Sequence, residues 1–111
     1  MRPATPVVKM GSIGFFYGAS MRLSLDQLAA FSAVAGECSF SAAARKLGKS
    51  QSAVSISIAN LEIDLGVTLF DRSHRYPHLT TEGRALLRDA ETILGQCFTM
   101  ENRANSLAEE L

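Results

Sequence analysis

The stretch SQSAVSISIANLEIDLG, residues 50–66, constrains the fold most, because it can be interpreted in two opposite ways. Its first half alternates serine with apolar residues, which is the period of a half-buried strand. The larger aliphatic residues recur instead at intervals of 4, 3 and 4, which is the spacing of one helix face. These residues are Val54, Ile58, Leu61 and Leu65. Ser50 can cap the start and Gly66 the end, about four turns apart, so the sequence predicts a helix.

A first helix is predicted over residues 24–36, SLDQLAAFSAVAG. Ser24 can cap its start, and Gln27 stands where it can complete a capping box. Gly36 is suited to close this helix, because glycine tolerates the left-handed conformation of a C-terminal cap. Apolar residues at helical spacing would give the helix one inward face.

A second, short helix is predicted in SAAARKLG, residues 41–48, with Ser39 or Ser41 as its cap. Its small alanines would let another helix approach closely, and Gly48 can end it abruptly. The turn LGKS then leads into the helix over residues 50–66. Two helices joined in this way match the helix-turn-helix plan, in which the second helix lies in the major groove of DNA.

The outward side of the helix over residues 50–66 carries polar or small residues at its start. Glutamine can pair bidentately with adenine, serine hydroxyls reach bases or phosphates, and an isoleucine can touch a thymine methyl group. The predicted base-reading residues are Gln51, Ser52, Ser55 and Ile56. The alternative is that these are only solvated residues of a surface helix.

The spacing of the apolar residues changes in VTLFDRSHRYPHLT, residues 67–80. The pattern predicts two short strands, 69–71 and 76–79, around a turn at residues 73–75, which together form a small β wing. Pro77 would confine its strand to an edge position, because proline has no backbone N–H to donate.

Three wing residues have alternative roles. Arg72 can contact DNA or pair with Glu62 to hold the wing on the preceding helix, and the two uses can coexist. His74 and His78 could ligate a metal, but they flank a turn with no cysteine close by. No metal site is therefore predicted.

A long helix is predicted to begin at Thr80 and to fill residues 81–111. Its apolar residues follow a strict 4-3-4-3 spacing, which is a heptad seam. The seam consists of Leu86, Ala90, Ile93, Cys97, Met100, Ala104, Leu107 and Leu111. A helix of this length spans about 45 Å and cannot bury the seam against one small domain, so we expect a homodimer through residues 81–111. The final AEEL contains no helix stop signal, so we expect the natural protein to continue.

Composition excludes several classes of protein. The formal net charge is zero, with an acidic excess in the tail and a slightly basic middle segment. Cys38 and Cys97 form no C-x-x-C pair, so neither a disulfide framework nor a zinc site is predicted. No apolar run approaches the roughly 18 residues that a membrane span needs, so we expect a cytoplasmic protein without membrane contact. Residues 1–20 are interpreted as a disordered leader or extended start. We find no nucleophile–base pair and no Gly-rich phosphate loop, so no enzyme is predicted.

Four motifs carry a resemblance to a known family: S-x-x-A-A, Q-S-A-V-S, L-E-x-x-L-G-x-x-L-F-x-R and L-T-x-x-G. In combination they make residues 21–85 similar to the N-terminal domain of LysR-type transcriptional regulators. The resemblance implies a mainly α fold, in which a winged helix-turn-helix domain, residues 21–80, precedes a dimerisation linker helix, residues 81–111. It also implies a C-terminal domain, absent here, that binds a small-molecule co-inducer, whereas this chain itself needs no cofactor. The expected partner is double-stranded DNA with an interrupted inverted repeat, bound by a homodimer that can form a tetramer in a full-length protein.

The family's contacts can be carried over residue by residue. Major-groove contacts fall on Gln51, Ser52 and Ser55. Contacts to phosphates or through the wing fall on Ser39, Phe40, Ser41, Lys49, Ser50, Arg72 and Arg75. This sequence departs from the family in ISIAN, residues 56–60, where relatives commonly carry basic or long polar residues. The sparse charge there is the best support for an alternative, a winged-helix protein–protein interaction module with a coiled-coil tail that does not bind DNA.

Overall fold

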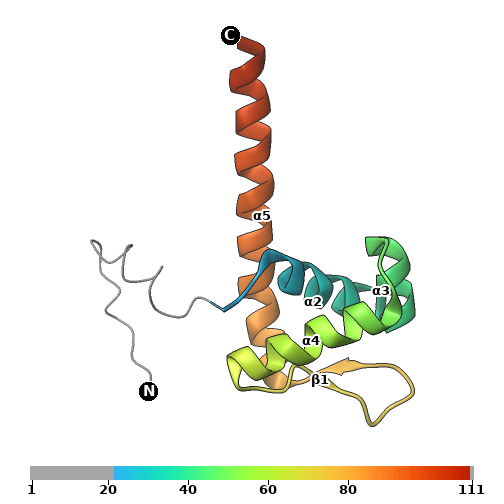
Figure 1. Ribbon diagram of the computed structural model, residues 1–111. Helices are drawn as coiled ribbons and strands as arrows, with labels where there is room; N and C mark the ends of the chain where they lie inside the picture. Colours follow the sequence, from blue (N-terminus) through green and yellow to red (C-terminus); the bar gives the residue numbers. More distant parts are fainter. Residues whose placement is uncertain (1–21, 111) are drawn as a thin grey trace, which may run out of the picture.

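The computed structural model describes residues 22–110 as a helical domain from which one long helix projects (Figure 1). The predicted fold class, a winged helix-turn-helix with a long C-terminal helix, is confirmed. The elements in chain order are α2 (Leu25–Glu37), α3 (Phe40–Leu47), α4 (Gln51–Leu65), β1 (Phe70–Asp71), β2 (His78–Leu79) and α5 (Thr81–Glu110). The predicted leader, residues 1–20, and Leu111 at the end of the seam lie outside the described residues.

The start of α2 is capped as its sequence predicts. The Ser24 hydroxyl accepts a hydrogen bond from the Gln27 amide at 3.1 Å, and the Gln27 side chain accepts one from the Ser24 amide at 2.9 Å. The predicted end at Gly36 is wrong, because the helix continues through this residue to Glu37. Cys38 is the left-handed residue instead, with φ 53°, and its amide donates to the Val34 carbonyl at 2.8 Å. The reversal falls there because α3 already requires an extended cap at the next position.

The same local signals bound α3 and α4. Ser39 caps α3 and Ser50 caps α4, each accepting a hydrogen bond from the amide three residues on. Gly48 and Gly66 end these helices in the left-handed conformation, with φ 68° and φ 74°. The stretch over residues 50–66 is therefore a helix, as the aliphatic spacing predicts.

One apolar core joins the helices and β1. α2 packs against each of α3, α4 and α5. The aliphatic stripe of α4 faces this core, with Val54, Ile58 and Leu61 fully buried and Leu65 partly buried. Phe70 of β1 meets the Phe31 ring edge-on at a centroid distance of 5.7 Å. The core therefore holds α4 by one face and leaves the opposite face free.

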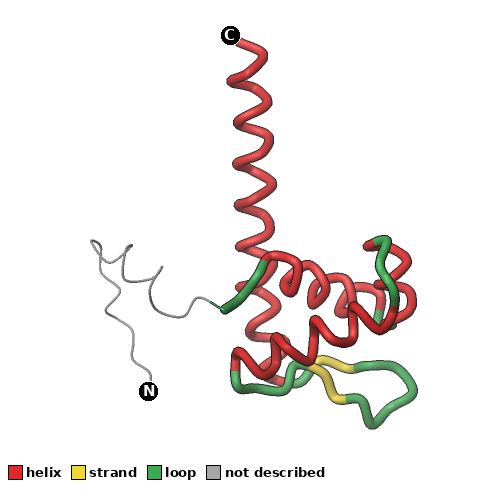
Figure 2. The backbone as a smooth tube through the Cα atoms, viewed as in Figure 1, coloured by secondary structure: helices red, strands yellow, loops and turns green. Residues whose placement is uncertain are grey.

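The wing is shorter than predicted (Figure 2). β1 and β2 are antiparallel and only two residues long, with Phe70 opposite Leu79 and Asp71 opposite His78. Pro77, expected inside the second strand, precedes it. The ladder stops because the Asp71 carboxylate accepts from the Ser73 amide at 3.0 Å and hydroxyl at 2.7 Å, which turns the chain away.

Thr80 joins the wing to α5. Its hydroxyl accepts from the Gly83 amide at 2.8 Å, which caps the helix, and donates to the Thr68 carbonyl at 2.6 Å. Its amide donates to the Leu69 carbonyl at 3.0 Å. Beyond this junction α5 runs away from the domain (Figure 1). None of the helices described in the structure has the length and apolar character to cross a membrane.

Candidate nucleic-acid interface

The predicted base-reading residues lie on the free face of α4. Gln51, Ser52 and Ile56 are exposed, and Ser55 is half-buried between this face and the core. α4 and the wing lie at the end of the domain remote from the free end of α5 (Figure 1). No part of the described chain covers the start of α4, so it is sterically free to enter a groove.

The predicted phosphate-binding residues gather at the N-termini of α3 and α4. The hydroxyls of Ser39 and Ser41 lie 3.2 Å apart and are half-buried at the start of α3. Lys49 and Ser50 are exposed in the turn before α4. Helix N-termini carry partial positive charge and free backbone N–H groups, so both positions suit the phosphate backbone of a nucleic acid.

Arg72 is held by its own chain from two sides. Its guanidinium lies 3.8 Å from a Glu62 carboxylate oxygen and 4.8 Å from the centroid of the Phe40 ring. The alternative role considered for Arg72, pairing with Glu62, is therefore present in the structure. The side chain still has 43% of its surface exposed, so the ion pair contributes little and leaves room for a phosphate. Phe40, predicted only as part of a phosphate contact, is thus also a platform for the wing arginine.

Glu62 fastens the wing to α4. Its second carboxylate oxygen accepts hydrogen bonds from the Leu69 amide at 2.8 Å and the Phe70 amide at 3.3 Å. The sequence predicted Glu62 only as a partner of Arg72. Its hydrogen bonds to the β1 backbone had no signal in the periodicity, because they depend on the fold bringing β1 beside α4. The consequence is that α4 and the wing are joined by direct contacts and form one continuous surface.

At the tip of the wing Arg75 lies against its neighbour Tyr76, 5.5 Å from the ring centroid. The His74 and His78 rings are stacked at 4.3 Å, and His74 lies 3.5 Å from the Asp71 carboxylate. The hydrogen bonds from Ser73, with the nearby histidines, lower the pKa of Asp71. Among the residues that the structure describes, no group of three or more potential ligands could hold a metal ion.

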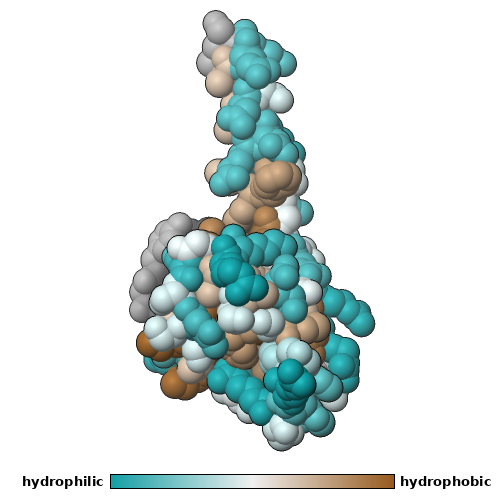
Figure 3. All heavy atoms as spheres, turned by 90° about the vertical axis from the view of Figure 1, so that its right-hand side faces the viewer, coloured by the Kyte–Doolittle hydropathy of each residue, from teal (hydrophilic) through white to brown (hydrophobic). Residues whose placement is uncertain are grey.

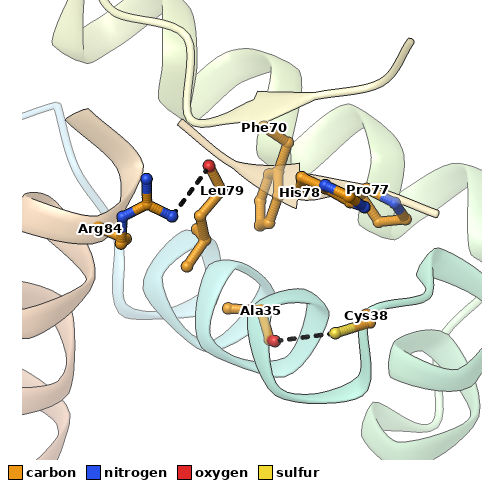
Figure 4. Close-up of a pocket in the computed structure, with 7 residues that line it drawn as sticks. All are labelled: Ala35, Cys38, Phe70, Pro77, His78, Leu79 and Arg84. Atoms are coloured by element: carbon orange, nitrogen blue, oxygen red, sulfur yellow. Dashed lines mark hydrogen bonds between the residues drawn. The ribbon is translucent and has the colours of Figure 1, made fainter. Parts of the chain in front are cut away.

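A small cavity of about 250 Å³ lies between the end of α2, the wing and the start of α5 (Figure 4). Cys38, His78 and Arg84 contribute to its wall. Arg84 donates to the Leu79 carbonyl at 3.5 Å and the Cys38 thiol to the Ala35 carbonyl at 3.8 Å. Both polar groups are already hydrogen-bonded to backbone carbonyls of the same chain. We therefore interpret the cavity as a packing gap between α2, the wing and α5.

The predicted dimer seam needs a correction at its beginning. Ala90 has only 2% of its surface exposed, and Leu86 packs against the same core, so the domain itself covers these two positions. Spacing alone could not show this, because one face of α5 meets first α2 and then solvent. From Ile93 onward the seam is open, with Met100, Ala104 and Leu107 exposed and Cys97 half-buried. Apolar surface gathers where α5 leaves the domain (Figure 3).

A helix-turn-helix with an open second helix, flanked by a two-stranded wing, defines a DNA-binding domain of the winged helix-turn-helix class. The sequence profile of the family "Bacterial regulatory helix-turn-helix protein, lysR family" matches residues 25–84. The chain belongs to this family, which confirms the resemblance carried by the four motifs.

Two relatives show the extent of the similarity. The chain is 48% identical over 91 residues to the HTH-type transcriptional regulator AceR of Acinetobacter baumannii, covering 82% of this chain and 31% of the relative. It is 49% identical over 74 residues to a probable RuBisCO transcriptional regulator of Cyanidioschyzon merolae, covering 67% of this chain and 24% of the relative. The chain thus spans less than a third of the length of these relatives.

Solved structures share the fold over most of the chain. The CbnR_DBD–DNA complex is similar with a TM-score of 0.71 and 40% identity, covering 78% of this chain and 99% of that chain. The BenM_DBD/benA site 1 DNA complex is similar with a TM-score of 0.73 and 35% identity, covering 78% and 97%. Both are DNA-binding domains in complex with DNA, and the similarity includes the winged helix-turn-helix described above.

Proposed function

We propose that this chain supplies the sequence-specific DNA-binding part of a LysR-type transcriptional regulator, which binds double-stranded DNA as a homodimer. The observation that carries the proposal is the open face of α4, held beside the wing by the contacts of Glu62. The similar CbnR and BenM domains, which form DNA complexes, support it. The protein–protein alternative has no comparable support, since the matched relatives are named as transcriptional regulators.

Each part of the surface has its own role in this proposal. Phosphate contacts fix the register of the protein on the duplex, and side chains in the major groove read base edges. Base reading is assigned to Gln51, Ser52, Ser55 and Ile56. Phosphate and wing contacts are assigned to Ser39, Phe40, Ser41, Lys49, Ser50, Arg72 and Arg75. The chain acts by binding and not by catalysis.

Dimerisation would proceed through the open part of the seam on α5, from Ile93 to Leu107. Two domains held at a fixed separation favour an interrupted inverted repeat as the DNA site. A tetramer, a co-inducer bound to a C-terminal domain, and a cytoplasmic, nucleoid-associated location complete the proposal. These parts rest on the family and concern a longer protein.

The test begins with selection of bound duplexes from a random DNA pool. Fluorescence anisotropy at several salt concentrations should give a steep fall of affinity with salt, because bound phosphates release counterions. Gln51→Ala should broaden the selected base preference, whereas Arg72→Ala should weaken binding to all sequences and reduce the salt slope by about 1.

Gln96→Ala is the matched control, since Gln96 is exposed on α5 and off the seam. Its base preference and salt slope should equal those of the wild type. Binding without sequence preference or salt dependence would reject the proposal, and an unchanged preference in Gln51→Ala would reject the role of that residue.

A further inference from the structure

The outward face of α4 carries an apolar ridge, formed by Ile56, Ala59 and Ile63. These residues follow intervals of 3 and 4, so they form one line on the helix surface. Ile56 has 60% and Ile63 73% of its surface exposed, and Ala59 is exposed as well. Such a line on a helix that already buries its opposite face requires an explanation, because large exposed apolar patches commonly mark interaction sites.

The ridge also lacks charge. α4 contains no lysine or arginine. Its two acids are held on other sides of the helix: Glu62 binds the wing, and Asp64 accepts a hydrogen bond from Gln27 at 3.3 Å. A ridge without cations cannot grip phosphates, which sets it apart from the exposed Lys49 before α4.

The major groove offers an apolar side chain one good partner, the methyl group at C5 of a pyrimidine. Thymine carries this group, and the other base edges present hydrogen-bonding atoms. The ridge is continuous with the exposed Ser52, one turn before Ile56, and adjoins the half-buried Ser55. This continuity with the DNA-reading surface argues for DNA, rather than another protein, as the molecule that covers it.

We propose that the ridge on α4 recognises pyrimidine C5-methyl groups, so that the preferred site carries thymines opposite Ile56 and Ile63. This inference rests on the proposed function, because it requires α4 to lie in the major groove. Seven residues separate the two isoleucines, which corresponds to about 10 Å along the helix. At 3.4 Å per base pair the two thymines lie about three base pairs apart or closer.

The test uses the selected DNA site and replaces each thymine in turn by uracil, which removes only the methyl group. Burial of one such group contributes about 0.8 kcal/mol, so the loss at each of two positions should be about fourfold in Kd. Where a thymine–adenine pair is changed to cytosine–guanine, 5-methylcytosine should bind better than cytosine by a similar factor.

Protein variants assign each methyl group to a side chain. Ile56→Ala should make thymine and uracil equivalent at one position, and Ile63→Ala should do so at the other. Ile56→Val retains branched methyl groups and should keep most of the discrimination. Both isoleucines are exposed and all three substitutions make the side chain smaller, so the fold should persist, which circular dichroism can verify.

Uracil tolerated at every thymine, or a penalty that persists unchanged in both alanine variants, would overturn this inference while leaving sequence-specific binding intact. A protein partner seated in the shallow hollow between Ile63 and Val67 is the competing occupant. It would appear as loss of self-association or partner binding in Ile63→Ala with DNA binding unaltered, which also overturns the inference. Failure of the proposed function is a different result, since no specific site would then be selected.

Discussion

Gly83→Ala should destabilise the domain, although alanine is the better helix former. Gly83 is buried in the first turn of α5, where the helix crosses the end of the loop before β1. A Cβ atom placed there would lie far inside van der Waals contact with the Leu69 carbonyl oxygen and 3.1 Å from the Leu79 side chain. The carbonyl cannot simply move aside, because it accepts the hydrogen bond from the Thr80 amide.

The expected change in the free energy of unfolding is the sum of two destabilising contributions and one stabilising contribution. Relief of the clash by small shifts costs about 2 kcal/mol, as for other overpacked sites. Weakening of the Thr80–Leu69 hydrogen bond costs about 1 kcal/mol. The higher helix propensity of alanine returns about 1 kcal/mol. We therefore expect a net loss of about 2 kcal/mol, which is a large part of the stability of a small domain.

Gly95→Ala is the matched control, because it makes the same substitution in the same helix. A Cβ atom at Gly95 meets no other atom within 4 Å, so only the propensity contribution of about 1 kcal/mol should remain, as a gain. Urea unfolding at one fixed protein concentration, with linear extrapolation to water, measures the free energy of unfolding of both variants. A Gly83→Ala protein as stable as the wild type would refute the close approach of α5 to Leu69.

Three further predictions concern the wing and α5. Glu62→Ala should cost about 2 kcal/mol in urea unfolding, because it leaves two part-buried amides without an acceptor, and Glu62→Gln should cost less. The lowered pKa of Asp71 means that its hold on the Ser73 amide is complete above the ordinary carboxyl pKa and is lost as pH falls through the lowered value. The NMR shift of that amide should therefore move below about pH 4 in the wild type and stay constant in Asp71→Asn. Met100→Asp should abolish the proposed homodimer in sedimentation experiments, whereas Asn102→Asp, off the seam, should not.

The accurate parts of the sequence prediction were those decided within a few residues. The capping box of Ser24 and the caps of α4 depend only on local hydrogen bonds and backbone freedom, so sequence alone predicts them. The end of α2 was misplaced, because glycine permits a left-handed cap but does not impose one. Cys38 adopts that conformation because the next helix starts immediately after it.

Features that depend on tertiary contact could not be predicted in the same way. Heptad spacing identified one face of α5 but could not show that the core of the domain covers Ala90. The placement of Arg72 on the Phe40 ring joins residues far apart in the chain, and no periodicity reports it. The exposure of Gln51, Ser52 and Ile56 followed from the aliphatic stripe, because a helix that buries one face must present the other.

The Thr80 junction also contributes to the orientation of α5 relative to the domain. The helix has 30 residues and is rooted in the domain only over its first turns, so it behaves as a lever arm. A tilt of roughly 10° at its base would displace the far end by about 8 Å, given a length of about 45 Å. The Thr80 hydroxyl, shared between the Thr68 carbonyl and the Gly83 amide, opposes that tilt together with the packing of Leu86 and Ala90 in the core.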